Sequence, residues 1–222
     1  MSHHSHNGEQ MGNKRAEYYN TLAQEVFFPA YPVIANQILE RSGIDHGYCL
    51  DIGSGPGHLS LSLATLSDLK VCAMDNSPAM CSIAEENIRK YRLERRVRAI
   101  FGDVNEIPLN TGSMDLVVSR GTVSFWRSLS RGLSECLRVL RPGGTACIGN
   151  GFGNARIRDE ILATMRKRDP EWEVKREERS RIYSAARFQP ALDYAGIREY
   201  EMVDDDSGFW VMFRKSGMQK FR

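Results

Sequence analysis

The residues best suited to chemistry lie in one glycine-rich segment, Cys49-Leu-Asp-Ile-Gly-Ser-Gly-Pro-Gly-His58. Gly53, Gly55 and Gly57 permit a tight backbone turn and let a ligand approach without obstruction by a Cβ atom. The segment lies between an apolar strand-like run and a leucine-rich helical run, and the free N–H groups at a helix N-terminus favour an anionic group. Asp51, two residues before the first glycine, can accept a hydrogen bond from an ammonium group, whereas it offers nothing to a pyrophosphate.

Two further acids follow the next strand-like runs of the chain. Asp75 ends the second run, 18 residues after Gly57, and a carboxylate at that place accepts hydrogen bonds from both hydroxyls of a ribose. Asp103 ends the third run, where its carboxylate can reach the exocyclic amine of adenine or can simply cap a turn. Because ligands of open α/β sheets bind outside the carboxyl ends of the strands, the three acids indicate a pocket for an adenosine-bearing ligand with an amino group.

The order of the predicted elements explains how these acids come together. Strand and helix alternate up to residue 150, which predicts βαβ units and an α/β fold with a Rossmann-like, doubly wound, mostly parallel sheet. The predicted strands cover residues 48–52, 70–74, 97–101, 115–119 and 145–149. Besides the helix after the glycine-rich segment, predicted helices cover residues 14–27, 31–42, 78–91 and 124–140.

The pattern changes after residue 150. Helical patterns cover residues 154–168 and 187–195, and a densely charged run over 169–184 lies between them. Two predicted strands follow, over 198–203 and 209–214, with a polar turn at 204–208. The two strands predict a closing antiparallel hairpin. We therefore expect a helical insertion at about residues 154–195 within one domain.

Bulk composition limits the class of protein further. The formal net charge of +2, from 30 basic and 28 acidic side chains, is too balanced to indicate nucleic acid as a partner. No run reaches the roughly 18 apolar residues of a membrane span, and the N-terminus lacks the apolar core of a signal peptide. Five cysteines without a C-x-x-C pair predict free thiols in a reducing compartment, so we expect a cytoplasmic protein. We expect either a monomer or a homodimer.

The N-terminal stretch contains three of the five histidines, His3, His4 and His6. Short His-rich tracts can bind metal, and a disordered tail is the simpler interpretation. No histidine cluster with the spacing of metal ligands occurs, so we expect no metal site. We expect a tail over residues 1–13 and a single domain over residues 14–222.

Four features together resemble the class I S-adenosylmethionine-dependent methyltransferases. They are Leu50-Asp-Ile-Gly-Ser-Gly-Pro-Gly57, the acid ending the second strand, Gly102-Asp-Val-Asn-Glu-Ile-Pro-Leu109, and Leu137-Arg-Val-Leu-Arg-Pro-Gly-Gly144 followed by a strand. The likeness runs from about Tyr48 to Asn150. It implies methyl transfer with S-adenosylmethionine as cofactor and S-adenosylhomocysteine as product. It also implies a seven-stranded sheet of order 3-2-1-4-5-7-6, with strand seven antiparallel.

Within that family, the chain resembles a group of small bacterial and archaeal enzymes with three further motifs. Here these read Phe28-Pro-Ala-Tyr-Pro-Val-Ile-Ala35, Ser119-Arg-Gly-Thr-Val-Ser-Phe-Trp126 and Gly151-Phe-Gly-Asn154. The family resemblance also implies which residues bind the cofactor: Asp51, Gly53, Ser54, Gly55 and Gly57 at the methionine part, Asp75 and Asn76 at the ribose, Asp103 and Val104 at adenine, and Ser119 closing the site.

Acceptor-binding residues are expected in the N-terminal helices and after strands four and five. Arg120 could clamp a carboxylate or phosphate through two parallel hydrogen bonds, or form a surface salt bridge. Phe125 and Trp126, predicted to open the helix over residues 124–140, could wall the acceptor or pack on the core. The remaining candidates are Asn150 and Phe152 after strand five, and Tyr31, with Tyr18 and Tyr19, in a lid or in helical packing.

Several functions fit this pattern. The first is methyl transfer to a small-molecule acceptor by in-line displacement; the sequence names no catalytic base. The second is a methyltransferase for RNA or protein, for which the nine basic and seven acidic residues of 156–181 could form a binding face or only a solvated helix. The third is a nicotinamide-dependent oxidoreductase, whose G-x-G-x-x-G pattern needs glycine at position 58, where this chain has His58. The fourth is a non-catalytic protein that binds S-adenosylmethionine.

Overall fold

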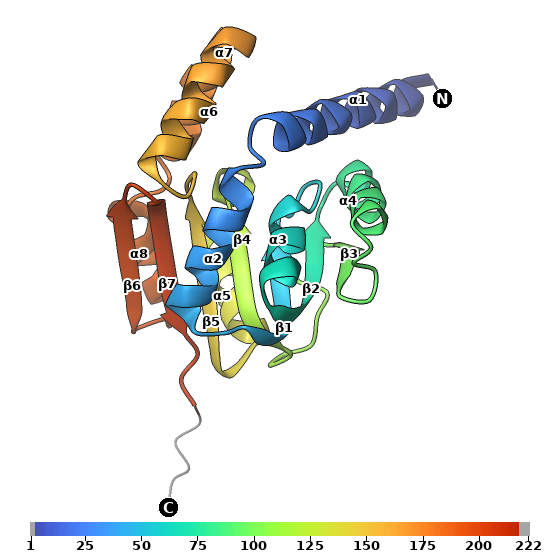
Figure 1. Cartoon of the computed structure of the whole chain (residues 1–222). Coiled ribbons are helices and arrows are strands. Elements are labelled where there is room, and N and C mark those ends of the chain that lie inside the picture. The colour runs from blue at the N-terminus through green and yellow to red at the C-terminus, as the bar shows by residue number, and fades with distance from the viewer. Residues whose placement is uncertain (1–2, 218–222) are drawn as a thin grey trace, which may run out of the picture.

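The computed structural model describes residues 3–217 of the chain, with side chains from Gly12 onward. Its strands form one sheet in the order β3-β2-β1-β4-β5-β7-β6 (Figure 1). β1 to β5 pair in parallel, and β7 is antiparallel to β5 and β6. The predicted strand order and the antiparallel closing strand are therefore confirmed. The strands are β1 His46–Ile52, β2 Asp68–Asp75, β3 Val97–Phe101, β4 Met114–Arg120, β5 Leu140–Asn150, β6 Tyr200–Asp205 and β7 Gly208–Arg214.

Helices cover both faces of the sheet (Figure 1). Buried side chains of α1, α2, α3, α4 and α6 pack on one face, and those of α5 and α8 pack on the other. The helices are α1 His3–Glu25, α2 Ala30–Ser42, α3 His58–Leu66, α4 Pro78–Lys90, the 3-10 helix η1 Val123–Phe125, α5 Leu129–Val139, α6 Ala155–Arg168, α7 Pro170–Ser180 and α8 Ala185–Tyr194. Residues 154–195, for which a helical insertion was predicted, contain α6, α7 and α8.

The central strands are buried on both sides because their successive side chains point to opposite faces. Cys49 and Leu116 belong to the apolar cluster on one face, and Leu50 and Val117 belong to the cluster on the other. All four side chains are fully buried. This double covering fixes the register of β1 and β4, since a slip by one residue would exchange the two faces, and it places the carboxyl ends of both strands at one edge.

The first helix differs from the sequence-based expectation at its start. α1 begins at His3, so residues 3–13 continue the helix where a tail was predicted. Glu9, Gln10 and Met11 have favourable helix propensities, and four exposed residues separate them from the packed part of α1, which starts at Ala16. Figure 1 shows α1 lying across the edge at which the parallel strands end.

The helix predicted over residues 124–140 is interrupted. Val123–Phe125 form the short η1, and α5 begins only at Leu129. Ser128 starts α5 because its hydroxyl accepts a hydrogen bond from the Arg131 N–H, at 3.2 Å. The Trp126 ring, between the two helices, packs on Gly132, where a Cβ atom would lie 2.5 Å from it. The expectation that Phe125 and Trp126 open this helix was therefore wrong.

Within the described residues, the five cysteines are free thiols, as predicted. Four of them are buried and Cys81 is partly buried. No helix over residues 3–217 is both long enough and apolar enough to cross a lipid bilayer.

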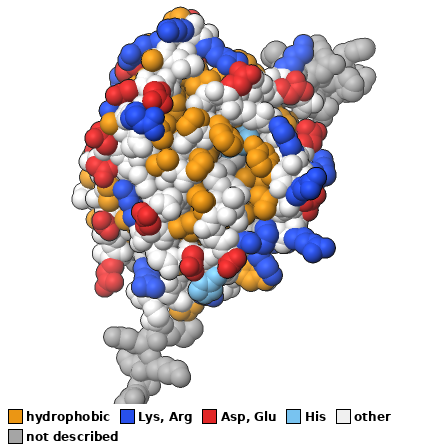
Figure 2. All heavy atoms as spheres, viewed as in Figure 1, with side chains coloured by type: hydrophobic (Ala, Val, Ile, Leu, Met, Phe, Trp, Pro, Cys, Tyr) orange, Lys and Arg blue, Asp and Glu red, His pale blue; other side chains and the backbone are white. Residues whose placement is uncertain are grey.

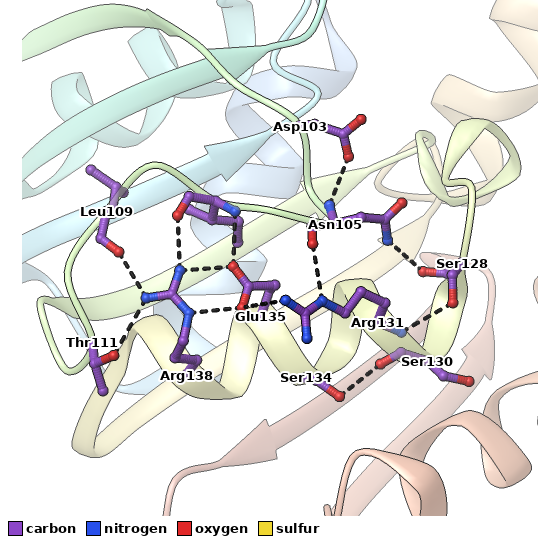
Figure 3. Close-up of polar contacts among 11 residues, drawn as sticks. Asp103, Asn105, Leu109, Thr111, Ser128, Ser130, Arg131, Ser134, Glu135 and Arg138 are labelled. Carbon is purple, nitrogen blue, oxygen red and sulfur yellow. Dashed lines mark hydrogen bonds and ion pairs between the residues drawn. The ribbon is translucent and has the colours of Figure 1, made fainter.

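A buried ion pair attaches the loop after β3 to α5 (Figure 3). Glu135 is 4% exposed and accepts a hydrogen bond from the Ile107 N–H at 2.8 Å. Its two carboxylate oxygens also accept from Nε and Nη2 of Arg138, each at 2.7 Å. Arg138 also donates to the carbonyls of Ile107 and Leu109, each at 2.8 Å. Further hydrogen bonds join the same loop to this helix and its N-cap through Asn105, Ser128 and Arg131. The ion pair thus holds the loop that carries Asp103.

Replacing Arg138 by Met should lower the free energy of unfolding by about 3 kcal/mol, because a buried Glu135 carboxylate then lacks its counter-ion. Arg138 lowers the pKa of Glu135, so the difference between the two proteins should be full above the ordinary pKa of a glutamate and should shrink as the pH falls through the lowered pKa of Glu135. Urea unfolding measures both effects.

The matched control is Arg131→Met, since the Arg131 side chain is 60% exposed and lies 3.9 Å from Glu135. It should cost less than about 1 kcal/mol. Equal losses in the two variants would contradict the assigned role of the Arg138 pair.

Candidate functional site

The glycine-rich segment forms a turn that only glycine adopts readily. Gly53, Gly55 and Gly57 have φ angles of +66°, +53° and +84°, in the left-handed region that side chains disfavour. A Cβ atom on Gly53 would also lie 2.5 Å from the Thr122 side chain. The hydroxyl of Ser54 is buried and has no hydrogen-bond partner among the described residues. The turn therefore combines glycines, which have no Cβ atoms, with one buried hydroxyl that can still form hydrogen bonds.

Asp51 lies at the carboxyl end of β1 and is 1% exposed. Ser60, in α3, donates to one carboxylate oxygen at 2.6 Å. Burial raises the pKa of Asp51 to about 7, with a smaller contribution from the charge of Asp75, although the Ser60 hydrogen bond acts in the opposite direction. A buried carboxylate with one described hydrogen bond has unused lone pairs and is stabilised by a cation.

Asp75 connects the end of β2 to the glycine turn. One of its oxygens accepts a hydrogen bond from the Gly55 N–H and the other from the Ser77 N–H, both at 2.9 Å. Burial raises the pKa of Asp75, and these hydrogen bonds oppose that effect. Asn76, which follows it, is exposed.

Asp103 follows β3, in the loop held by Glu135. Its carboxylate caps the turn by accepting from the Asn105 N–H at 2.7 Å, and its other oxygen lies 3.1 Å from Arg127. Val104, next in the chain, is 7% exposed. Asp103 therefore does cap a turn, and its carboxylate lies at the end of the strand beside β2.

A chain of hydroxyls and an indole follows β4. The buried Ser119 hydroxyl donates to the Ile52 carbonyl at 3.0 Å and lies 2.6 Å from the Thr122 hydroxyl. The Trp126 indole N–H donates to Thr122 at 3.0 Å. Sequence reasoning found Ser119 and Trp126 but missed Thr122, although its place in the segment after strand four was a usable signal.

α1 covers the glycine turn through a polar network that the sequence did not reveal. Asn87 of α4 donates to the Pro56 carbonyl at 2.9 Å and to the Asn20 side chain at 3.1 Å. His58 lies 3.2 Å from the same Asn20 oxygen, and burial lowers its pKa to about 4. Tyr19, 39% exposed, approaches the turn closely enough that a Cβ atom on Gly55 would lie 3.7 Å from its ring.

A second group of residues lies at the ends of β4 and β5. The Arg120 guanidinium lies 5.7 Å from the centre of the Tyr31 ring and 5.2 Å from that of Phe152. Its Nε donates to the Gly151 carbonyl at 3.0 Å. Arg120 forms no salt bridge with the described residues, so that alternative for it was wrong. The structure therefore brings together three residues predicted for the acceptor.

The other predicted acceptor residues are placed differently. Phe125 is 59% exposed, and its ring lies 5.2 Å from the guanidinium of Arg179 on α7. Asn150 lies beside Gly121, where a Cβ atom would be 3.5 Å from its side-chain oxygen. Tyr183, which sequence reasoning missed in the charged run, is 9% exposed and accepts a hydrogen bond from the Val123 N–H at 3.0 Å.

The loop after β5 is pressed against the turn of the C-terminal hairpin. A Cβ atom on Gly151 would collide with the Ser207 carbonyl, and one on Gly208 would collide with the backbone of Asn150. Arg41 of α2 donates to the Ser207 hydroxyl at 3.0 Å. The carbonyl that holds Arg120 is thus positioned by the last two strands of the chain.

Comparisons with known proteins identify the family of this chain. A family model described as a methyltransferase domain matches residues 50–148. A solved Methanococcus maripaludis protein, assigned as an S-adenosyl-L-methionine-dependent methyltransferase, is 40% identical, with a TM-score of 0.89 and coverage of 94% of this chain and 95% of that one.

Two curated relatives are also similar over part of their length. The malonyl-(acyl-carrier protein) O-methyltransferase of Geobacter sulfurreducens is 27% identical over 187 residues, 81% of this chain and 68% of that protein. The chloroplastic 2-methyl-6-phytyl-1,4-hydroquinone methyltransferase 2 of Oryza sativa subsp. japonica is 33% identical over 100 residues. The likeness to the rice protein covers 45% of this chain and only 28% of the rice protein.

Proposed function

Because this chain belongs to the class I S-adenosylmethionine-dependent methyltransferases, we propose that it methylates a small-molecule acceptor. The observation that carries the proposal is the set of enclosed rings beside Arg120: Tyr31, Phe152 and Tyr183 are 5%, 9% and 9% exposed. Rings buried to this degree suit a ligand of few atoms, whereas a loop of RNA or protein needs an open surface.

The residues at the carboxyl edge fit the cofactor, S-adenosylmethionine. The buried Asp51 carboxylate has free lone pairs for an ammonium group, and the unpartnered Ser54 hydroxyl lies in the turn beside it. We assign the methionine part to Asp51, Gly53, Ser54, Gly55 and Gly57, the ribose to Asp75 and Asn76, adenine to Asp103 and Val104, and closure of the site to Ser119.

The cofactor would supply a methyl group activated by a sulfonium, and a nucleophile would attack the methyl carbon in line with the methyl–sulfur bond. The residues of the chain contribute mainly by positioning. Asp51 would hold the amino-acid part and Asp75 the ribose, and the hydrogen bond from the Ser119 hydroxyl to the Ile52 carbonyl fixes the end of β4 against β1. Orientation of this kind is worth up to about 7–11 kcal/mol of the barrier in favourable cases.

The charges on α6 and α7 support a small acceptor over RNA. An RNA-binding face needs basic side chains that are free to reach phosphates. Most of the basic residues in 156–181 instead lie within 4 Å of acids: Arg156, Arg158, Arg166, Arg168, Lys175 and Arg176. These pairs agree with a solvated helix of mixed charge. Of the curated relatives, the rice enzyme is named for a hydroquinone acceptor.

Asp75→Ala should weaken S-adenosylmethionine binding by about tenfold or more, because two charge-assisted hydrogen bonds to the ribose are lost. Isothermal titration calorimetry measures the change. Asp68→Ala, at the opposite end of β2 and 90% exposed in its side chain, is the matched control and should bind normally. Unchanged affinity in Asp75→Ala would contradict the ribose assignment.

Cofactor affinity should depend on pH through Asp51. Its pKa of about 7 in the free protein means that an ammonium ligand must displace a proton at lower pH, so affinity rises with pH through this range. Binding should weaken about 25-fold between roughly pH 7.5 and pH 5.5. Calorimetry at a series of pH values tests this, and Asp51→Asn should bind weakly with a flat profile. An equal pH slope in both proteins would rule out Asp51 as the titrating group.

The acceptor class is tested by incubating the protein with methyl-labelled cofactor and an extract of the source cells, then separating the products by size. We expect the label in the small-molecule fraction. Label in RNA or protein would favour the corresponding macromolecular acceptor, and label in no fraction would favour a non-catalytic binding protein; either result overturns the proposal.

A further inference from the structure

Arg120 is held in one orientation by three contacts. The rings of Tyr31 and Phe152 lie against its guanidinium, and the Gly151 carbonyl accepts from its Nε. We call Arg120, Tyr31, Phe152 and Tyr183 the Arg120 cluster. A guanidinium fixed in this way has lost most of its side-chain freedom before any ligand binds. Ligand binding therefore costs less conformational entropy of the arginine side chain.

The two terminal nitrogens of Arg120 are unused. Within residues 12–217, neither nitrogen has a hydrogen-bond or ion-pair partner, although the side chain is only partly exposed. Other partly buried arginines behave differently: Arg96 gives its terminal nitrogen to the carbonyls of Ser67 and Leu69 at 2.7 and 2.8 Å, and Arg138 pairs with Glu135. The free face of Arg120 is therefore a planar, two-pronged donor without a counter-ion.

Two phenol groups add donors to the same cluster. Tyr183 accepts from the Val123 N–H, which leaves its own proton to donate, and no described residue accepts the hydroxyl proton of Tyr31. Burial raises the pKa of both tyrosines, and the nearby Arg120 charge opposes this effect without overcoming it. Both phenols thus remain protonated at neutral pH. The cluster therefore offers the guanidinium fork and two phenol protons, and it contains no acidic side chain.

The titratable groups around the cluster are poor candidates for a general base. The charged or titratable neighbours of Tyr31 are Tyr19, Arg120, Asp51 and His58. Asp51 accepts from Ser60 and is assigned to the cofactor ammonium. The His58 ring lies 5.5 Å from that of Tyr31, but its Nε2 faces Asn20, and its pKa of about 4 makes it a weak base. A nucleophile bound here has to arrive already deprotonated.

We propose that the methyl acceptor is a small carboxylic acid, bound as its carboxylate by the free face of Arg120 and converted to a methyl ester. This inference rests on the proposed function and narrows it. Carboxylic acids are ionised at neutral pH without a base, and their two oxygens match the fork of a guanidinium. One carboxylate oxygen forms a bond to the methyl carbon as the methyl–sulfur bond breaks and its electron pair stays on sulfur. No proton moves, and the two opposite charges disappear together.

The chemistry of the product tests this proposal. Methyl esters are cleaved by mild alkali and release the methyl group as volatile methanol, whereas methyl groups on nitrogen, carbon, sulfur or ether oxygen stay in place. The small-molecule fraction labelled by the protein is treated with alkali, and the volatile label is counted. We expect most of the label to become volatile. Stable label would overturn the carboxylate inference while leaving small-molecule methylation intact, and no label in that fraction would overturn the proposed function itself.

Variants of Arg120 provide the second test. Over a dilution series of the unlabelled small-molecule fraction, Arg120→Met should need about tenfold more acceptor for its half-maximal rate of ester formation. Arg120→Lys, which keeps the charge without the fork, should lie between it and the wild type. Calorimetric affinity for S-adenosylmethionine, which also reports folding, should stay within about twofold in both variants.

The matched control is Arg156→Met, an arginine on α6 with a 74% exposed side chain, which should behave as the wild type. If Arg120→Met and Arg120→Lys lost cofactor binding while the control retained it, Arg120 would belong to the cofactor site and the proposal would be wrong. Unchanged acceptor dependence in both Arg120 variants would equally overturn it.

Discussion

The backbone of the glycine turn is the constraint on which the rest of the site depends. Three positive φ angles within five residues turn the chain from β1 into α3. These angles are free of steric strain only because the three residues lack a Cβ atom. The same absence lets Thr122 approach from the loop after β4 and lets Asp75 accept from the Gly55 N–H. Side chains at these positions would strain the backbone and separate the strand ends that the turn now brings together.

Charge is distributed unequally around this turn. Acids lie at the ends of β1, β2 and β3, and the cation Arg120 lies on the other side, at the end of β4. The buried Asp51 carboxylate therefore favours a positively charged group, whereas Arg120 favours a negatively charged one. Burial strengthens both preferences, because charges in a weakly polar surrounding interact over a given distance more strongly than in water.

The sequence was sufficient for the sheet and for the acids because both follow local rules. Alternating elements predicted the parallel core, and the glycine spacing with Asp51 and Asp75 located the turn. Contacts between distant segments could not be predicted from the sequence, because a polar residue on a helix has the same sequence pattern whether it faces solvent or another segment. Asn20 and Tyr183 are examples: their roles depend on how α1 and the segment after α7 fold back over the strand ends, which no local pattern records.

The tight approach of Gly151 to the hairpin turn at Ser207 has a consequence for the order in which the two halves of the site can form. The acids and the glycine turn lie within the first half of the chain, so they are available early during synthesis on the ribosome, which proceeds from the N-terminus. The carbonyl that orients Arg120 gains its support only when β7 joins β5. The support for the orientation of Arg120 is therefore completed later in synthesis than the segment that carries the glycine turn and its acids.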